Sequence, residues 1–361
     1  MKIVYIGAGD ALAQALAERM GQEGNDIYLL SDKALEKKPK GVSLHRFYRS
    51  PRKGENFGKL LRSIAPDCVI FAGNDYIGGA HGEESEEDVT LLARSLRAAA
   101  FPQVKFILLS STEVYGNTEG KADESAPCTA VSERGIRFIQ EEQLLEIYQK
   151  QHGMDAVILR TSQLYSDRPK EGNGDFLSQS FSAAARSENR MTANVFQPLH
   201  VSDLVDAVKR VMDAGTQRVY NVCGGADISA QHLYQLICWQ QGLQEQAVRW
   251  EDPGCVSLAD SGRIRRELGW SNFRNLEEQL KKGEIAYERV KAKGRNKKKW
   301  TIPADIRQMA ENLVLFEAFF LLSSLCSSHS LFSQIDWLMV YVILIAISYN
   351  IYQSALAEGG V

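Results

Sequence analysis

Residues 3–13 read IVYIGAGDALA, a short apolar run followed by a glycine-rich turn and the start of a helical pattern that continues to Met20. An apolar strand, a glycine-rich turn and a helix in this order form the unit with which parallel α/β proteins hold the diphosphate of a dinucleotide. Gly7 and Gly9 would allow backbone N–H groups to approach that diphosphate at the start of the helix. The stretch therefore predicts a strand inside a parallel sheet, with a site for NAD or NADP at its end.

The glycine pattern is incomplete, so cofactor binding stays open. The spacing GxGxxG would need glycine at position 12, and GxxGxxG would need it at positions 10 and 13, where the chain has Leu12, Asp10 and Ala13. Asp10 would put a carboxylate where the diphosphate would lie, or it would simply cap the helix. Asp32, after the second apolar run, would bond the adenosine ribose or act as an ordinary turn residue.

Apolar runs alternate with helical patterns over residues 1–165. After the first run come Ile27–Leu30, Cys68–Ala72, Phe106–Leu109 and Ala156–Leu159, with helical stretches such as Val89–Ala99 between them. Continuous apolar strands alternating with helices are typical of a doubly wound parallel sheet covered on both faces. We expect this Rossmann-type sheet over residues 1–165. A smaller α/β substrate lobe, interleaved with the sheet, is expected over 166–290, with helices near 176–187, 202–214 and 230–242.

Composition excludes several classes of site. The 361 residues have a net charge of −3, which gives no global basic field for binding nucleic acid. Six cysteines are scattered without a CxxC pair, so neither a disulfide framework nor a zinc site is expected. We predict no metal site.

The composition changes abruptly after residue 290. Residues 291–299 hold six Lys or Arg and no acid, and the apolar segments Leu313–Cys326 and Trp337–Ala357 follow. The second segment matches the roughly 20 residues that a helix needs to cross a bilayer. We expect a basic linker at 291–308 and two transmembrane helices at 309–358; the alternative is a helical hairpin packed on the soluble domain. The positive-inside rule then predicts a cell-membrane protein whose soluble domain faces the cytoplasm.

Several short segments occur in a characteristic order. They are SSTEVYG at Ser110–Gly116, RTSQLYS at Arg160–Ser166, HVSDLVDA at His200–Ala207, VYNV at Val219–Val222 followed by two glycines, and RRELGW at Arg265–Trp270 after Asp260. In this order the segments resemble the extended short-chain dehydrogenase/reductase family, which includes NDP-sugar epimerases and dehydratases. The resemblance covers residues 1 to about 290.

The resemblance implies a catalytic pair that this chain lacks. In the family, a Tyr-xxx-Lys pair on the helix after the SSxxVYG segment moves a proton while nicotinamide moves a hydride. The chain has Arg134 and Phe138 at those positions, and Ser111 remains at the position of the substrate-orienting hydroxyl. A guanidinium stays protonated at working pH, so Arg134 cannot act as the base. Losing a general base costs about 10²–10⁴-fold in rate.

Contacts with the ligands are also implied by the resemblance. They are Ala72 with the cofactor, and Glu113, Gln163, Arg168 and Arg190 with a nucleotide sugar. Arg190 would replace a phosphate-binding arginine that the family usually has before the HVxD segment, and Arg168 with Lys170 would hold a diphosphate. Charged side chains are mostly exposed, so both arginines would otherwise be ordinary surface residues.

Two hypotheses for function follow. The first is a membrane-tethered, catalytically degenerate relative of these enzymes that serves as a binding, regulatory or scaffolding module in cell-envelope or exopolysaccharide biosynthesis. Its partners would be a nucleotide sugar, membrane-associated polysaccharide-assembly proteins and a second copy of the chain, paired through Val89–Ala99 and Arg134–Gln149. The alternative is an active NAD(P)-dependent epimerase, dehydratase or reductase whose acid–base pair has moved, for example to Glu113, Asp75, His81 or Glu133.

Overall fold

The computed structural model describes most of the chain up to residue 289. The described residues are 1–7, 11–31, 35, 39, 43–47, 57–73, 85–100, 103–171, 175–216, 218–271 and 274–289. The predictions made for Gly9, Asp10, Asp32, Asp75, His81 and the segments 291–308 and 309–358 lie outside these residues. Among the residues that are described, no helix is both long and apolar enough to cross a membrane.

A parallel sheet of seven strands forms the centre of the fold, in the order β11-β6-β5-β4-β1-β2-β3. Its strands are β1 (Lys2–Gly7), β2 (Asp26–Leu30), β3 (Leu44–Phe47), β4 (Cys68–Gly73), β5 (Lys105–Ser111), β6 (Asp155–Thr161) and β11 (Val219–Val222). Each predicted apolar run lies in one of these strands, which confirms the Rossmann-type sheet. The strand order reverses between β1 and β4, and parallel α/β folds bind their ligands at the carboxyl ends of strands beside such a point.

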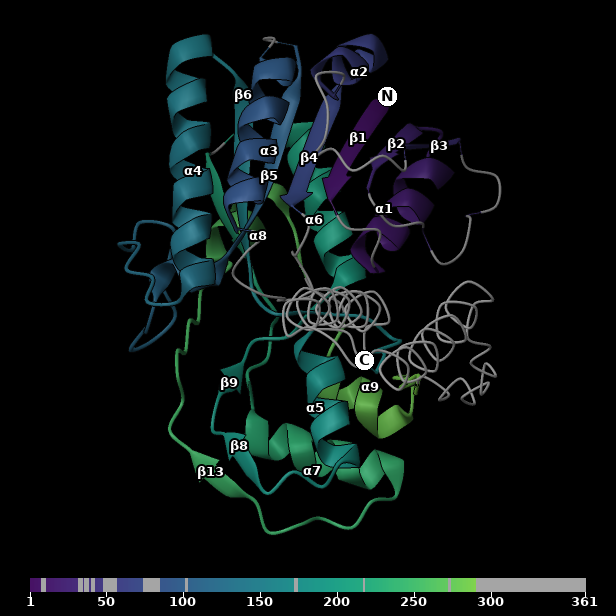
Figure 1. Ribbon diagram of the computed structural model, residues 1–361, viewed down its shortest axis with the longest axis vertical. Coiled ribbons are helices and arrows are strands. Elements are labelled where there is room, and N and C mark those ends of the chain that lie inside the picture. Colours follow the sequence, from purple (N-terminus) through teal and green to yellow (C-terminus); the bar gives the residue numbers. More distant parts are fainter. Residues whose placement is uncertain are drawn as a thin grey trace, which may run out of the picture. The chain divides into compact units, whose positions relative to one another are not determined.

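Helices cover both faces of the sheet (Figure 1). They are α1 (Ala11–Gln22), α2 (Phe57–Ile64), α3 (Ser85–Ala99), α4 (Glu133–His152) and α6 (Val201–Ala214). Figure 1 shows α3 and α4 side by side over one face, with α6 on the other.

Successive strand residues point into two different cores. In β1, Ile3 and Tyr5 belong to the core beneath α1 and α6, whereas Val4 and Ile6 belong to the core beneath α2, α3 and α4. This follows from the alternation of side chains along a strand. Because both faces are buried, β1 must be apolar throughout, which explains the continuous run in the sequence.

A smaller lobe extends from the carboxyl ends of the strands and has its own core (Figure 1). It contains the helices α5 (Phe176–Ala185), α7 (Ala230–Gln241) and α9 (Leu276–Lys282), and the short strand pairs β7 (Leu164–Tyr165) with β10 (Leu199–His200), β9 (Val195–Phe196) with β12 (Ile228–Ser229), and β8 (Arg190–Thr192) with β13 (Arg249–Glu251). The chain returns from this lobe to the sheet through α6 and β11, and α8 (Gly262–Leu268) packs on β11. The lobe and the sheet are therefore interleaved in sequence.

Candidate functional site

Ser111 is the last residue of β5 and starts a tight turn at the carboxyl edge of the sheet. Its Oγ accepts a hydrogen bond of 3.2 Å from the backbone N–H of Glu113 and so caps the short 3₁₀ helix Thr112–Tyr115. The cap fixes the direction in which Glu113 leaves the strand. The sequence segment SSTEVYG thus places Ser111 and Glu113 in one tight turn at the predicted site.

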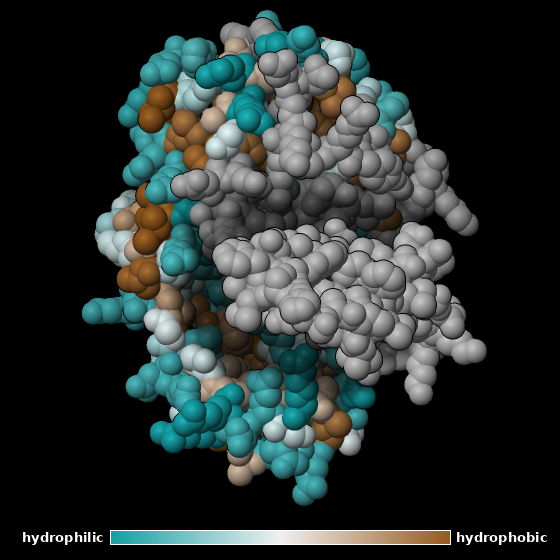
Figure 2. Space-filling model, viewed as in Figure 1, coloured by the Kyte–Doolittle hydropathy of each residue, from teal (hydrophilic) through white to brown (hydrophobic). Residues whose placement is uncertain are grey.

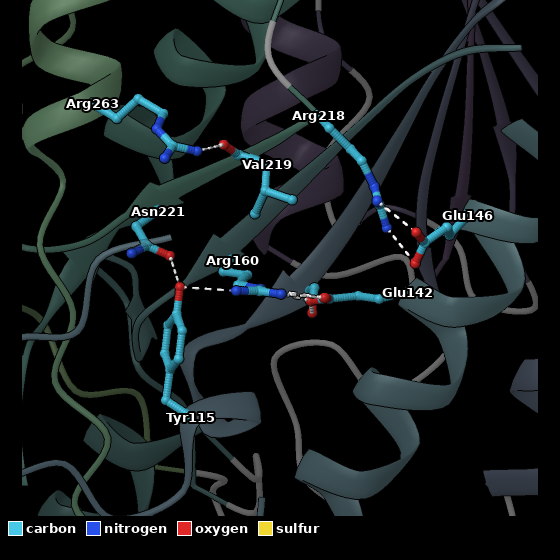
Figure 3. A network of polar contacts seen from close by, with 9 residues as sticks. Tyr115, Glu142, Glu146, Arg160, Arg218, Val219, Asn221 and Arg263 are labelled. Atoms are coloured by element: carbon cyan, nitrogen blue, oxygen red, sulfur yellow. Dashed lines mark hydrogen bonds and ion pairs between the residues drawn. The ribbon is translucent and has the colours of Figure 1, made fainter. Parts of the chain in front are cut away.

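The rotation of α4 over this turn is set by a buried ion pair (Figure 3). Arg160 of β6 donates from Nη2 to Glu142 Oε2 of α4 at 2.6 Å and from Nε to Glu142 Oε1 at 3.0 Å. Ser110 Oγ donates to Glu142 Oε1 at 2.6 Å, and all three residues are buried. Arg134 and Phe138 precede Glu142 at intervals of four residues, so they share its side of the helix.

Arg134 meets Glu113 across the gap between α4 and the turn. Its Nη1 lies 3.2 Å from Glu113 Oε1, while Ser132 Oγ donates to Glu113 Oε2 at 3.1 Å. Gly135 permits this close approach, because a Cβ there would lie 2.8 Å from the backbone oxygen of Glu113. The position that the resemblance assigns to a tyrosine therefore holds a cation engaged by a carboxylate.

Phe138 occupies the position that the resemblance assigns to the lysine. Its ring is 2% exposed and belongs to the core beneath α1 and α6. The guanidinium groups of Arg134 and Arg137 lie 5.5 Å and 5.1 Å from the ring centroid. This arrangement supplies packing and cation–π attraction, but the ring itself offers neither a charge nor a hydrogen-bond donor.

The buried network continues from Arg160 to β11. Arg160 Nη1 donates to the hydroxyl of Tyr115 at 3.0 Å, and that hydroxyl donates to Asn221 Oδ1 at 2.7 Å (Figure 3). Burial raises the pKa of Tyr115 to about 12, so the phenol stays protonated. Burial alone would lower the pKa of Arg160, but the hydrogen bonds and charge of Glu142 raise it instead. Tyr115 is thus a structural phenol and not a free base.

Sequence reasoning did not identify this network as a unit. The sequence contained a signal for it, because Arg160 directly follows the apolar run Ala156–Leu159 in a buried strand, and a buried charge needs a partner. The partner, Glu142, stands 18 residues earlier in a helix with other acids beside it. Only the packing of α4 on β5 and β6 selects Glu142 among them.

Gln163 joins the edge of the sheet to the lobe. Its Oε1 accepts the backbone N–H of Gln197 at 2.9 Å, and its backbone oxygen accepts the N–H of Leu199 at 2.8 Å. The side chain of Gln197 in turn bonds the backbone of Ala259 in both directions. Gln163 therefore holds together the segments that line this end of the lobe.

The two arginines predicted to bind substrate lie on the surface of the lobe. Arg168 is 3.6 Å from Glu288, and Arg190, on β8, is 3.6 Å from Glu251. Their side chains are 64% and 65% exposed. Figure 1 places β8 at the end of the lobe remote from the sheet, so the structure does not bring Arg190 to Ser111 and Glu113.

Of the predicted cofactor site, Gly7 and Ala72 lie in the described part of the chain. Gly7 ends β1 beside β4, and a Cβ there would lie 2.8 Å from the backbone oxygen of Gly73 and 3.0 Å from the Cβ of Ala72. Only glycine fits at position 7, because a side chain there would collide with the end of β4. Gly7 and Ala72 both lie at the carboxyl ends of adjacent strands, β1 and β4, where the strand order reverses and parallel α/β folds bind their ligands.

Comparison with known proteins identifies the family. The chain belongs to the NAD dependent epimerase/dehydratase family, whose model matches residues 4–223. It is 28% identical over 228 residues to a dTDP-glucose 4,6-dehydratase of Streptomyces griseus, covering 57% of this chain and 70% of that protein. It is 29% identical over 185 residues to an uncharacterised UDP-glucose epimerase of Bacillus subtilis, covering 47% of this chain and 58% of the relative.

Solved structures match the same fold. A dTDP-glucose 4,6-dehydratase of Bacillus anthracis in complex with NAD gives a TM-score of 0.67 at 16% identity, over 79% of this chain and 95% of that one. A UDP-glucose 4-epimerase of Thermotoga maritima with UDP-glucose gives 0.64 at 20% identity, over 78% and 96%. At these identities the likeness shows the fold, including the interleaved lobe.

Removing the buried carboxylate should destabilise the protein strongly. Glu142→Ala leaves the Arg160 charge buried without its main partner, so we expect a loss of about 3–5 kcal/mol in the free energy of unfolding. Urea denaturation of the purified protein measures it. A loss below about 1 kcal/mol would show that the pair does not hold α4 in place.

Glu146→Ala is the matched control, one turn further along α4. Glu146 pairs at the surface with Arg218 at 2.6 Å and Lys150 at 2.9 Å, and we expect a loss of less than about 1 kcal/mol. The hydrogen bond from Arg218 lowers the pKa of Glu146 from 4.5 to about 2. Any stabilisation from Glu146 is therefore present above pH 4.5 and is lost as the pH falls towards 2.

Proposed function

We propose that this member of the NAD dependent epimerase/dehydratase family binds a nucleotide sugar without turning it over, and serves as a binding, regulatory or scaffolding module. The observation that supports this is the ion pair of Arg134 with Glu113, next to the buried ring of Phe138. Arg134 and Phe138 occupy the two positions at which the resemblance requires the proton-transfer pair.

The chemistry of these groups argues against proton transfer. A nicotinamide cofactor, when bound, supplies a hydride acceptor, and the protein must remove the hydroxyl proton of the sugar at the same time. Arg134 has no basic lone pair to offer, because its guanidinium keeps its protons. Glu113 is a carboxylate, but its two oxygens accept from Ser132 and pair with Arg134. Ser111 would still orient a sugar hydroxyl.

Two observations support a nucleotide sugar as the ligand. The relatives named above act on dTDP-glucose or UDP-glucose by their names, and one matched structure contains UDP-glucose. The glycine-rich sequence after β1, with Gly7 and Gly9, supports binding of NAD or NADP, with backbone N–H groups at the diphosphate. In this proposal the cofactor is bound without reacting and forms part of the binding site.

The sequence beyond the described residues supports tethering to the cell membrane. The apolar segment Trp337–Ala357 has the length of a spanning helix, and a shorter one, Leu313–Cys326, precedes it. The six basic residues at 291–299 would keep the α/β domain on the cytoplasmic side. A sugar-nucleotide-binding domain at that face would meet membrane-associated polysaccharide-assembly proteins, which we propose as partners in cell-envelope or exopolysaccharide biosynthesis.

The purified full chain should bind a nucleotide sugar but show no turnover. We expect UDP-glucose or dTDP-glucose to raise the melting temperature by a few degrees, because a ligand that binds only the folded state stabilises it. We expect no change in nicotinamide absorbance or sugar product with either substrate and NAD or NADP, with the Streptomyces griseus dehydratase as positive control. Binding without turnover is the result that the proposal requires.

Detectable epimerase, dehydratase or reductase turnover would establish the active alternative instead. In that case Glu113→Gln and Ser111→Ala would locate the moved acid–base pair. Glu113→Gln would abolish turnover if this carboxylate is the base, and an unchanged rate would point elsewhere. If none of UDP-glucose, dTDP-glucose, NAD and NADP raises the melting temperature, only a structural role is left for the fold.

Membrane tethering has its own test. The full chain expressed in a bacterium should sediment with the membranes and stay there after an alkaline carbonate wash, because spanning helices are held by apolar contact and not by charge. Release into the supernatant by that wash would contradict the proposal.

We also propose that the exposed side of α4 pairs with a second copy of the chain. Ile136 and Ile147 on this helix are 45% and 48% exposed, and Val131, just before the helix, is 62% exposed. Between Ile136 and Ile147 the exposed residues are the uncharged Gln140 and Gln143. Figure 2 shows hydrophobic side chains gathered on the left of the view, over α4.

Charges on that face should separate the copies. We expect the wild-type chain to have the mass of a dimer by light scattering. The double variant Ile136→Glu with Ile147→Glu should have the mass of a monomer, because pairing would bury the introduced carboxylates of both copies at the interface. Trp239→Glu changes an exposed apolar residue on α7 and should leave the mass unchanged. A monomeric wild-type chain would disprove the interface.

A further inference from the structure

Residues Ile285–Glu288, near the end of the described chain, form an extended strap that lies along the segment 167–171. The backbone N–H of Ala286 donates to Asp167 O at 2.8 Å, and that of Glu288 donates to Pro169 O at 2.9 Å. The N–H of Glu171 returns a bond of 2.9 Å to Glu288 O. The strap thus runs parallel to the segment that carries Arg168.

One side of the strap is anchored in the core of the lobe. Ile285 is 2% exposed, and the ring of Tyr287 stacks on Phe181 with centroids 4.9 Å apart. The Tyr287 hydroxyl also lies 2.9 Å from Ser182 Oγ. Because side chains alternate along an extended chain, Ala286 and Glu288 point to the opposite side.

The carboxylate of Glu288, on that opposite side, is held by ion pairs. Its carboxylate lies 3.6 Å from Arg168 Nη1 and 3.7 Å from Lys170 Nζ, so one carboxylate meets two cations that stand two residues apart. Neither distance is short enough for a hydrogen bond. All three side chains are partly exposed, so water and salt screen the contacts and an anion of higher charge would compete with Glu288 effectively.

A diphosphate is such an anion. Its oxygens accept several charge-assisted hydrogen bonds at once, and an arginine fork fits them better than it fits a carboxylate held at 3.6 Å. Arg168 and Lys170 are also the two cations that the sequence predicted for a diphosphate. Glu288 therefore occupies, in this structure, the partners that the ligand would use.

We propose that the Glu288 carboxylate occupies the place of the ligand diphosphate in this structure. A bound nucleotide sugar displaces Glu288 from Arg168 and Lys170 and so loosens the end of the strap. This inference rests on the proposed binding function. The strap leads directly into residue 290 and the basic segment 291–299, so the ligand would change the state of the chain at the start of that segment. By linkage, anything that pulls Glu288 away would in turn raise the affinity for the ligand.

Removing the competing charge tests the proposal in the full chain. Glu288→Gln should bind UDP-glucose roughly two- to five-fold more tightly than the wild type by calorimetry, as expected for the loss of a weak surface ion pair. In the wild type, UDP-glucose should speed amide hydrogen exchange of the peptide 284–289. In Glu288→Gln that peptide should already exchange faster without ligand.

Glu284→Gln makes the same charge change four residues earlier, at an exposed position, and should behave as the wild type. In an Arg168→Gln and Lys170→Gln background, Glu288→Gln should give no gain in affinity, because the charges for which it competes are gone. Wild-type binding with no gain in Glu288→Gln would overturn this inference and leave the proposed function intact. Failure of UDP-glucose and dTDP-glucose to bind any variant would overturn both.

Discussion

The ion pair between Arg160 and Glu142 determines how the sheet and α4 meet. A buried charge is tolerated only when its partners are complete, and here Arg160 has Glu142 on one side and the Tyr115 hydroxyl on the other. Ser110 donates a hydrogen bond to the Glu142 carboxylate, and Asn221 accepts one from the Tyr115 hydroxyl. The network joins α4, β5, β6 and β11, so any rotation of the helix would break several buried hydrogen bonds together.

The residues that hold α4 on the sheet differ from those at the predicted reaction site. The groups that hold α4 lie one turn beyond Phe138, inside the sheet–helix contact, and they need neither residue 134 nor residue 138. Phe138 extends the apolar core, and the charge of Arg134 is matched by Glu113. The contact between α4 and the sheet therefore does not depend on a particular pair of residues at positions 134 and 138.

The lobe depends on pairings between distant parts of the chain. The segment just after β6 is held by Gln197 through Gln163, and further on by the strap through Pro169. Each contact joins residues that stand from tens to more than a hundred positions apart. Arg168 and Lys170, which the sequence predicts as ligand contacts, are therefore positioned by the strap Ile285–Glu288.

Sequence alone determined the elements and the family, because these depend on local patterns. Apolar runs such as Cys68–Ala72 are buried on both faces, and this requirement can be recognised without knowing the neighbours. Short segments such as SSTEVYG placed Ser111 and Glu113 together, since they share one turn. The tertiary structure decided that Glu113 pairs with Arg134, that Arg168 shares Glu288 with Lys170, and that Arg190 lies away from the strand ends. The physical reason is that a charged side chain takes whichever partner the packing of distant segments brings within about 4 Å, and no local periodicity encodes that choice.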